Sequence, residues 1–263
     1  FKRKMAKYPL LDNIQRTMRE RGLDLCAFFD VAWYNNSCPN HVLPDFGRKS
    51  CFGILVGNTK LLWDAFRNHV REHPDSVFLA NPLDEYIVSS VTTALSSHVP
   101  PGTRYEVRFA HETSPGRLVA IQRLAHISGL AFLDSDIHLN VHSIYGPWIA
   151  LRAAIVLDID YYNTQSGDEP PAESCNTIST PIELRNPCSD ECRTRIAKCF
   201  QSALQSPKDW HLWLAIRDAC DVGATYRYCQ EQILFHYTKD RSMLLDLAEV
   251  TSDAKLTEPV AHK

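Results

Sequence analysis

Three arginines stand next to apolar runs, where a guanidinium needs a partner for its charge. Arg152 follows the apolar segment 148–151, Arg217 follows 213–216, and Arg241 precedes 243–245. Each arginine on its own is best explained as half of a structural ion pair, because buried arginines are usually paired. Three converging arginines would instead suit a ligand with two carboxylates, since the planar guanidinium binds a carboxylate through two parallel hydrogen bonds.

Nine cysteines are scattered along the chain, an odd number that does not suit a secreted, disulfide-bonded framework. We therefore expect mostly reduced thiols in a cytoplasmic protein. Cys188, Cys192 and Cys199 have the spacing C-x3-C-x6-C, but structural zinc sites usually show two close pairs of ligands. With no matching pair of histidines nearby, the spacing favours free thiols over a metal site.

Several classes of function are disfavoured. The chain contains no G-x-G-x-x-G, P-loop or G-x-S-x-G element, which argues against nucleotide phosphates and serine-hydrolase chemistry, although flavin reductases need none of these motifs. With 28 basic and 31 acidic residues and a net charge of −3, the chain has no basic bias for nucleic acid. Its most apolar stretch, 148–157, is shorter than the about 20 residues of a membrane span and contains Arg152.

Helical and strand patterns alternate through the first 160 residues and would position these side chains. Apolar residues recur at helical spacing in 8–22, 59–73, 83–97 and 118–132. Strand patterns occupy 25–34, 52–56, 104–109, 138–145 and 148–157, and Gly146-Pro147 predicts a turn that pairs the last two strands. The prediction is an α+β fold, in which an antiparallel sheet is flanked by helices.

The composition changes after Asp158. Residues 161–190 are rich in proline, polar and acidic residues and are predicted to form a loop or linker. From 191 to 263 the pattern is helical and rich in aromatic residues. A length of 263 residues with 44% apolar content suits one core domain, 1–160, with an added C-terminal helical cap, 191–263.

His126 and Gly129 have the spacing His-x-x-Gly. Some cobalamin enzymes use Asp-x-His-x-x-Gly, in which the histidine replaces the cofactor's own base on cobalt and the aspartate orients the imidazole. Here Leu124 stands at the aspartate position. Because a histidine that binds a metal normally needs an orienting partner, His126 is expected to pack and hydrogen-bond rather than to bind cobalt.

Several segments together resemble the cobalamin-processing proteins of CblC type. The matching pieces are Phe29-Asp30-Val31-Ala32-Trp33-Tyr34-Asn35, His126-Ile127-Ser128-Gly129, the strand from His142 through Trp148 to Arg152, Asp209-Trp210, Ile216-Arg217-Asp218, Tyr228 to Gln232, and Arg241. The chain departs from the family between His126 and His142, where the segment is shorter than usual. There, Leu130-Ala131-Phe132-Leu133 replaces a run of tyrosines.

The resemblance implies a flavin-reductase-like (nitroreductase-related) core with a C-terminal helical cap, located in the cytoplasm. It implies an enzyme and chaperone that binds cobalamin base-off, with the dimethylbenzimidazole tail displaced from cobalt. Two reactions are implied: transfer of the alkyl group of alkylcobalamins to glutathione as cosubstrate, and reductive removal of cyanide from cyanocobalamin with electrons from FMN or FAD. The implied partner is a downstream cobalamin-trafficking protein, with neither nucleic acid nor a membrane.

By the same resemblance, glutathione would bind to Arg152, Arg217 and Arg241. The corrin ring would contact Val119, Ala120, Ile121, Gln122, His126, Leu133 and Leu151. No catalytic side chain and no resident metal are implied, because the cobalt of the substrate carries the reaction. Two other functions stay open: a flavin-dependent reductase that does not bind cobalamin, and a carrier that passes cobalamin on without chemistry.

Overall fold

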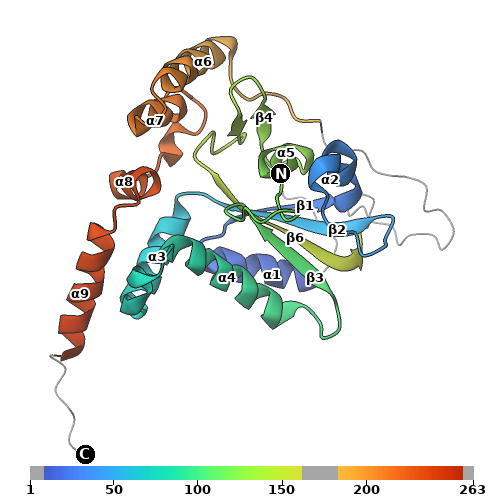
Figure 1. Ribbon diagram of the computed structural model, residues 1–263, viewed down its shortest axis with the longest axis horizontal. Helices are drawn as coiled ribbons and strands as arrows, with labels where there is room; N and C mark the ends of the chain where they lie inside the picture. Colours follow the sequence, from blue (N-terminus) through green and yellow to red (C-terminus); the bar gives the residue numbers. More distant parts are fainter. Residues whose placement is uncertain (1–8, 162–182, 257–263) are drawn as a thin grey trace, which may run out of the picture.

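The computed structural model describes residues 9–161 and 183–256, so most of the predicted linker 161–190 lies outside the described residues. A four-stranded antiparallel sheet forms the centre (Figure 1), with the strand order β1-β2-β6-β3. Its strands are β1 (Leu25–Asp30), β2 (Cys51–Asn58), β3 (Tyr105–Phe109) and β6 (Ala150–Asp160). A separate two-stranded sheet pairs β4 (Phe132–Asp134) with β5 (Leu139–Val141).

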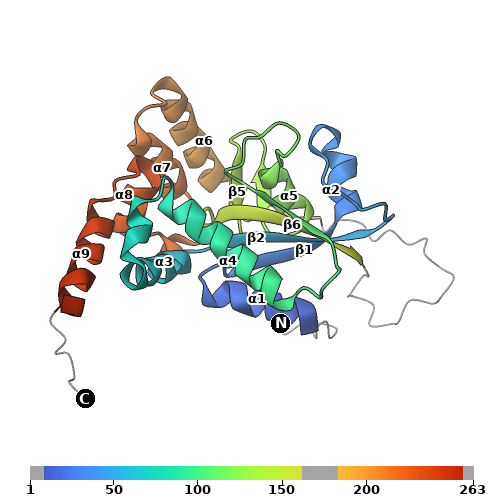
Figure 2. The same ribbon diagram turned by 60° about the horizontal axis from the view of Figure 1, so that its bottom comes forward.

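Helices cover both faces of the central sheet (Figures 1 and 2). One face carries α1 (Pro9–Glu20), α3 (Leu61–Glu72) and α4 (Pro82–His98), and the other carries α2 (Val31–Ser37) and α5 (Ile121–Ile127). The side chains of β6 point alternately to the two faces of the sheet, and this explains why both faces are covered. Ala153, Ile155 and Leu157 belong to the core beneath α1, α3 and α4, whereas Ala154 and Val156 belong to the core beneath α2 and α5. A strand that is apolar on both sides needs a layer on each side.

The C-terminal part is helical, as predicted. It comprises α6 (Asp190–Gln205), α7 (Trp210–Asp218), α8 (Gln230–Thr238) and α9 (Ser242–Leu256). Figure 1 shows these helices in a row along one side of the sheet, with α6 at one end and α9 at the other. Among the described helices, none is both long and apolar enough to cross a bilayer.

The predicted strand 25–34 ends early, and its second half is helical. Strand β1 stops at Asp30, whose carboxylate accepts a hydrogen bond from the backbone N–H of Ala32 at 3.0 Å. A side chain that accepts from the first turn is the usual start of a helix, and α2 begins at Val31. The motif Phe29–Asn35 therefore spans the end of a strand and the start of a helix.

Two further expectations were wrong. The predicted helix 118–132 is only the short α5, because Gly129 adopts φ +77° after it and the chain then enters β4. The predicted pairing of 138–145 with 148–157 does not form either. Strand β5 pairs with β4, whereas β6 lies between β2 and β3. Apolar spacing predicts how strongly a segment is buried, but it does not determine which strand is its neighbour.

Two glycines bring the core and the helical part into direct backbone contact. Gly146 (φ +55°) follows β5, and Gly223 (φ +73°) follows α7. A Cβ atom on Gly223 would overlap the carbonyl group of Tyr145, and one on Gly146 would overlap the carbonyl oxygen of Val222. Both positions therefore need glycine, for its positive φ and for the space.

Candidate functional site: a cationic cavity beside a bulged strand

Strand β6 contains a bulge at Arg152. Its partners on β2 step from Val56, opposite Ala153, to Gly57, opposite Leu151, so Arg152 has no partner of its own on β2. On a regular strand Leu151 and Ala153 would share a face. Here Leu151 packs on the α2 and α5 side, and Ala153 packs on the α1, α3 and α4 side. The bulge thus turns the guanidinium of Arg152 toward α3 and α8, as bulges commonly re-aim a side chain.

Arg152 reaches a small, closed cavity of about 10 Å³, which has room for about one water molecule. Side chains from α3, α4, β6 and the region of α8 line it. The lining residues are Leu62, Trp63, Leu83, Arg152, Tyr228, Gln232, Phe235 and His236. The cavity is therefore apolar on the α3 side and polar on the α8 side.

The charge of Arg152 has no acidic partner among the described residues. Its Nε donates to Oδ1 of Asn58 at 2.6 Å, a neutral acceptor at the end of β2. Burial lowers the pKa of Arg152 from its ordinary value, because it removes water from the charged form. A guanidinium in this position favours an anionic ligand.

Arg217, on α7, lies against the same site. Its guanidinium carbon stands 5.9 Å from the ring centre of Trp148 and 5.7 Å from that of Tyr228. Three buried polar atoms here make no hydrogen bond of good geometry within the described parts of the chain: Nη1 of Arg217, Oη of Tyr228 and Oε1 of Gln232. Arg217 nevertheless lies close enough to the hydroxyl of Tyr228 to oppose the rise that burial causes in its pKa. Buried polar atoms are seldom left unpaired, so three in one place indicate a site for a polar ligand or for water.

His236 reports the electrostatic character of the cavity. Burial, followed by the positive charges of Arg217, Lys239 and Arg152, lowers the pKa of His236 from 6.5 to about 3. The imidazole is therefore neutral at neutral pH. Burial raises the pKa of Tyr228, and Arg217 and Arg152 oppose that shift. Both arginines thus act on the same two side chains, although they come from different elements.

Arg241 has other partners. Its guanidinium donates to the backbone carbonyls of Val77 at 3.2 Å and Leu79 at 2.9 Å, and also to that of Ala80. These carbonyls lie at the end of a short 3-10 helix, Pro74–Phe78, and just after it. The structure thus brings two of the three predicted glutathione ligands together, and Lys239 is a third positive charge near His236.

Most of the predicted corrin contacts gather around the other side of β6. Val119, Ala120, Ile121 and Leu151 are all half-buried and pack against the core beneath α2 and α5. The backbone N–H of Ala120 donates to the hydroxyl of Tyr34 at 2.8 Å. Gln122 is exposed, and its amide donates to the carbonyl of His138 at 2.8 Å. The chain thus presents a partly exposed apolar surface at the start of α5.

His126 is held by Leu133, another predicted contact. Its Nδ1 accepts the backbone N–H of Leu133 at 3.2 Å, and its ring meets the ring of Phe132 edge-on at 5.4 Å. An Nδ1 that accepts leaves the proton of the neutral imidazole on Nε2. Nε2 is then a donor in this arrangement.

Tyr228, Gln232 and His236 were missed in the sequence as site residues. They follow one another at intervals of four, the spacing that places side chains on one face of a helix. They lie next to Ile233, Leu234 and Phe235. A row of polar residues on one face of an otherwise apolar helix could therefore have identified them as site residues. Asn58 carried no comparable signal, because its role depends on the bulge opposite it.

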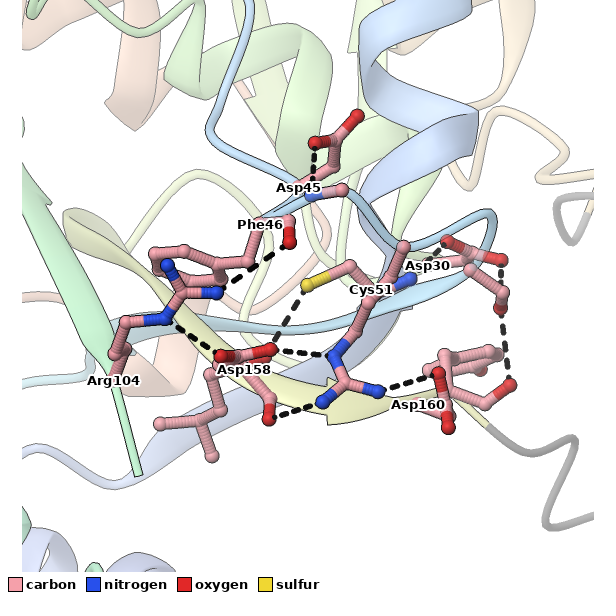
Figure 3. A network of polar contacts seen from close by, with 12 residues as sticks. Asp30, Asp45, Phe46, Cys51, Arg104, Asp158 and Asp160 are labelled. Carbon is pink, nitrogen blue, oxygen red and sulfur yellow. Dashed lines mark hydrogen bonds and ion pairs between the residues drawn. The ribbon is translucent and has the colours of Figure 1, made fainter. Parts of the chain in front are cut away.

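Arginines next to the far end of β6 have ordinary ion pairs, as Figure 3 shows. Asp158 receives Nε of Arg48 at 2.6 Å and Nε of Arg104 at 2.8 Å, and these two cations lower the pKa of Asp158. In this network the acidic and basic side chains neutralise one another at the end of β6. Arg152 and Arg217 differ from it because neither forms an ion pair with a described carboxylate, although Asp84 is near enough to act on the charge of Arg152.

A larger hollow of about 250 Å³ lies between the β4–β5 segment and α6. It is lined by Asp134, Asp136, Ile137, Asp190, Arg193, Thr194 and Ala197. Three carboxylates against one guanidinium make this hollow unfavourable for a dicarboxylate. The smaller, cationic cavity is therefore the candidate site for an anion.

The sheet order, the helices on both faces and the helical C-terminal part define an α+β protein with an antiparallel sheet flanked by helices, as predicted. A solved structure with this fold is that of the B12-trafficking protein CblC of C. elegans, a homologue of human MMACHC. The TM-score is 0.63, with 16% sequence identity, and the match covers 93% of this chain and 97% of that chain. No protein-family model and no curated protein sequence matches the chain.

Proposed function

We propose that this chain binds cobalamin base-off and removes its upper axial ligand, using glutathione as the acceptor of alkyl groups. The observation that carries the proposal is the pair Arg152 and Arg217, half-buried beside unpaired polar atoms and without an ion-pair partner in the described parts of the chain. The shared fold with a B12-trafficking protein supports the choice of cobalamin. A cytoplasmic location fits a reaction that needs reduced glutathione.

Glutathione matches the charges of this cavity. It carries two carboxylates and one ammonium, so two guanidinium groups could each bind one carboxylate. Tyr228 and Gln232 would add neutral hydrogen bonds that the closed cavity leaves unmade. Because the cavity has room for about one water molecule, α8 side chains must move when the ligand enters.

Dealkylation is a displacement at the alkyl carbon. The glutathione thiolate forms a carbon–sulfur bond as the cobalt–carbon bond breaks, and the bonding electron pair remains on cobalt, giving cob(I)alamin and a thioether. The protein contributes by holding the sulfur in line with the cobalt–carbon bond. In our proposal Arg152 and Arg217 position glutathione and take no part in bond making.

The surface around the start of α5 is the proposed corrin contact. Val119, Ala120, Ile121 and Leu151 would pack against the ring, with Gln122, His126 and Leu133 at its edge. For cyanocobalamin, reduced FMN or FAD would supply an electron to cobalt as cyanide leaves. The reduced product would then pass to a downstream cobalamin-trafficking protein.

Cobalamin absorbance provides the first test. Adding the protein to methylcobalamin should shift the spectrum toward the base-off form, and anaerobic glutathione should then convert it to reduced cobalamin. No base-off shift would contradict the proposal and favour a flavin reductase without cobalamin. A base-off shift without glutathione-dependent loss of methyl would favour a carrier.

Variants separate the glutathione site from cobalamin binding. Arg152→Ala and Arg217→Ala should each lower kcat/KM for glutathione about 10- to 100-fold, because a hydrogen bond to a charged group is lost. Cobalamin affinity should change much less. Arg104→Ala is the matched control, since Arg104 lies beside the same strand and its partner Asp158 keeps Arg48. Equal losses in cobalamin and glutathione binding would contradict the assigned roles.

A further inference from the structure

Three cysteine sulfurs meet where α6 begins and α7 ends. The Sγ atoms of Cys188, Cys192 and Cys220 lie within 4.8 Å of one another. Cys188 and Cys220 are the closest pair, with their sulfurs 3.6 Å apart. Cys192 and Cys220 are buried and Cys188 is half-buried. The cluster lies outside the cationic cavity, and the proposed reaction does not use it.

The spacing of the sulfurs suits a shared ion better than a disulfide. A tetrahedral zinc ion with zinc–sulfur bonds of about 2.3 Å holds its sulfur ligands about 3.8 Å apart. A disulfide joins two sulfurs at about 2.0 Å and leaves the third thiol unused. Here three thiols converge within 4.8 Å, and the separation of 3.6 Å between Cys188 and Cys220 is close to the value for a shared ion and far from that of a disulfide.

One of the three cysteines lies at the start of a helix. Cys192 lies in the first turn of α6, and its backbone N–H donates to the capping Oγ of Ser189 at 3.2 Å. The positive end of a helix favours negative charge at this position. No side-chain ammonium or guanidinium among the described residues bonds to these sulfurs.

We propose that Cys188, Cys192 and Cys220 bind one thiolate-preferring metal ion, for which Zn²⁺ is the probe. Three thiolates suit a soft or borderline ion such as Zn²⁺ and leave a fourth coordination position for another ligand. Binding displaces the thiol protons to solvent, without any oxidation or reduction. The ion would join the start of α6 to the end of α7, three residues beyond Arg217.

The spacing in the sequence, C-x3-C-x6-C, includes a different third cysteine and favoured free thiols. Cys188, Cys192 and Cys199 are close in the chain, but Cys199 is not part of the cluster. Cys220 takes its place, because α6 and α7 pack against each other and return the chain to the start of α6. Cys199 is thus the natural control, since it lies on the same helix.

Metal analysis of the full chain tests the proposal. Protein purified under reducing, anaerobic conditions, stripped with a chelator and then titrated with Zn²⁺ should bind one ion per chain. Titration with Co²⁺ instead should give the intense sulfur-to-cobalt charge-transfer absorbance of a thiolate site. Cys188→Ser, Cys192→Ser and Cys220→Ser should each weaken Zn²⁺ binding at least 100-fold, whereas Cys199→Ser should bind as the wild type does.

Two results would overturn the proposal. One is equal Zn²⁺ affinity in the wild type and in Cys220→Ser. The other is a mapped Cys188–Cys220 disulfide in protein that binds no Zn²⁺ when reduced. Far-UV circular dichroism checks that the variants fold, and the Co²⁺ spectrum of the wild type tests the site without any variant. A rise in the melting temperature with Zn²⁺ should occur in the wild type and in Cys199→Ser only.

Discussion

Arg152 and Arg104 belong to neighbouring strands and illustrate two uses of the same side chain. Arg104 is 64% exposed and shares Asp158 with Arg48, so its charge is neutralised at little cost. Arg152 donates to the amide oxygen of Asn58 and faces a cavity that also holds unpaired atoms of Tyr228 and Gln232. A carboxylate that entered the cavity would compensate the charge of Arg152, which has lost its contact with water. It would bring no such gain to Arg104, because the charge of Arg104 is already paired.

At the residue scale, the neutral His236 predicts how stability depends on pH. Its pKa is about 3 in the folded chain and about 6.5 when unfolded, so below pH 6.5 the unfolded state binds a proton that the folded state does not. Stability is therefore lost as the pH falls from about 6.5 toward 3. Between pH 7 and pH 5 the wild type should lose about 2 kcal/mol through this residue.

Urea unfolding of the wild type and His236→Gln at pH 7 and pH 5 measures this contribution. The wild type should lose about 2 kcal/mol more than the variant between the two values. Parallel losses would show that His236 titrates normally. NMR of the wild-type imidazole should likewise show no titration between pH 5 and pH 8, and a bound carboxylate should raise its pKa.

For Arg241 we expect the opposite of Arg217, namely a loss of stability with little effect on glutathione. Because its guanidinium bonds to three backbone carbonyls, Arg241→Ala should destabilise the chain by about 1–3 kcal/mol. The KM for glutathione should change less than twofold. Thermal unfolding and steady-state kinetics, run beside Arg217→Ala, distinguish the roles. A large rise in KM for Arg241→Ala would place it in the anion site.

Part of the candidate site could be predicted from residue type alone. Arg152 and Arg217 are conspicuous because a charge follows an apolar run, and burial makes that combination costly. The unpaired state of their charges could not be read from the sequence, since it depends on which carboxylates the fold brings near. Cys220 was missed for the same reason, because only the packing of α6 on α7 makes it a neighbour of Cys188.

At the scale of elements, Asp30 is the residue on which the junction of β1 and α2 depends. Its carboxylate accepts from Ala32 N at 3.0 Å, from Cys51 N at 3.2 Å and from Ser50 Oγ at 2.6 Å. Asp30→Ala removes a helix cap and leaves buried donors unpaired, so a loss of about 2–3 kcal/mol is expected.

Urea unfolding measures this loss, and Asp45→Ala is its control. Asp45 is exposed, and its carboxylate accepts the backbone N–H of Gly47 at 2.9 Å, as Figure 3 illustrates. Its replacement should cost about 0.5 kcal/mol. Similar losses for both variants would mean that Asp30 is not a special anchor.

The same junction explains which elements the sequence predicted well. Helices α3 and α4 and strands β2 and β3 have uniform patterns and lie close to their predicted bounds. The segments 25–34 and 118–132 change from one structure to another within a continuous apolar run. In the first segment the change from strand to helix depends on the helix cap at Asp30, and in the second the helix ends at the positive φ of Gly129. The spacing of apolar residues predicts neither feature.

At the scale of the whole molecule, the contact of Gly146 with Gly223 links the core to the helices that carry Arg217. Gly223→Ala should separate the two loops, since the new Cβ meets backbone that cannot rotate away. We expect a loss of about 3 kcal/mol or more, from the overlap together with the strain of a positive φ. The KM for glutathione should rise in the protein that remains folded.

Gly102→Ala separates these two causes. Gly102 has φ +88°, but no described atom lies within 4 Å of the position that an alanine Cβ would take, so only the strain of about 1–2 kcal/mol should be measured. Denaturant unfolding of both variants provides the comparison. Equal losses would mean that the loops can separate freely.

A joint at which backbone meets backbone also bears on how such a chain can diverge. Side chains pack beside it as well, since the rings of Tyr145 and Tyr226 meet edge-on at 4.7 Å. The backbone contact itself, however, requires only that positions 146 and 223 have a hydrogen atom in place of a side chain. Distant relatives should then be traceable by a pair of glycines at these loops, even where the neighbouring side chains have changed.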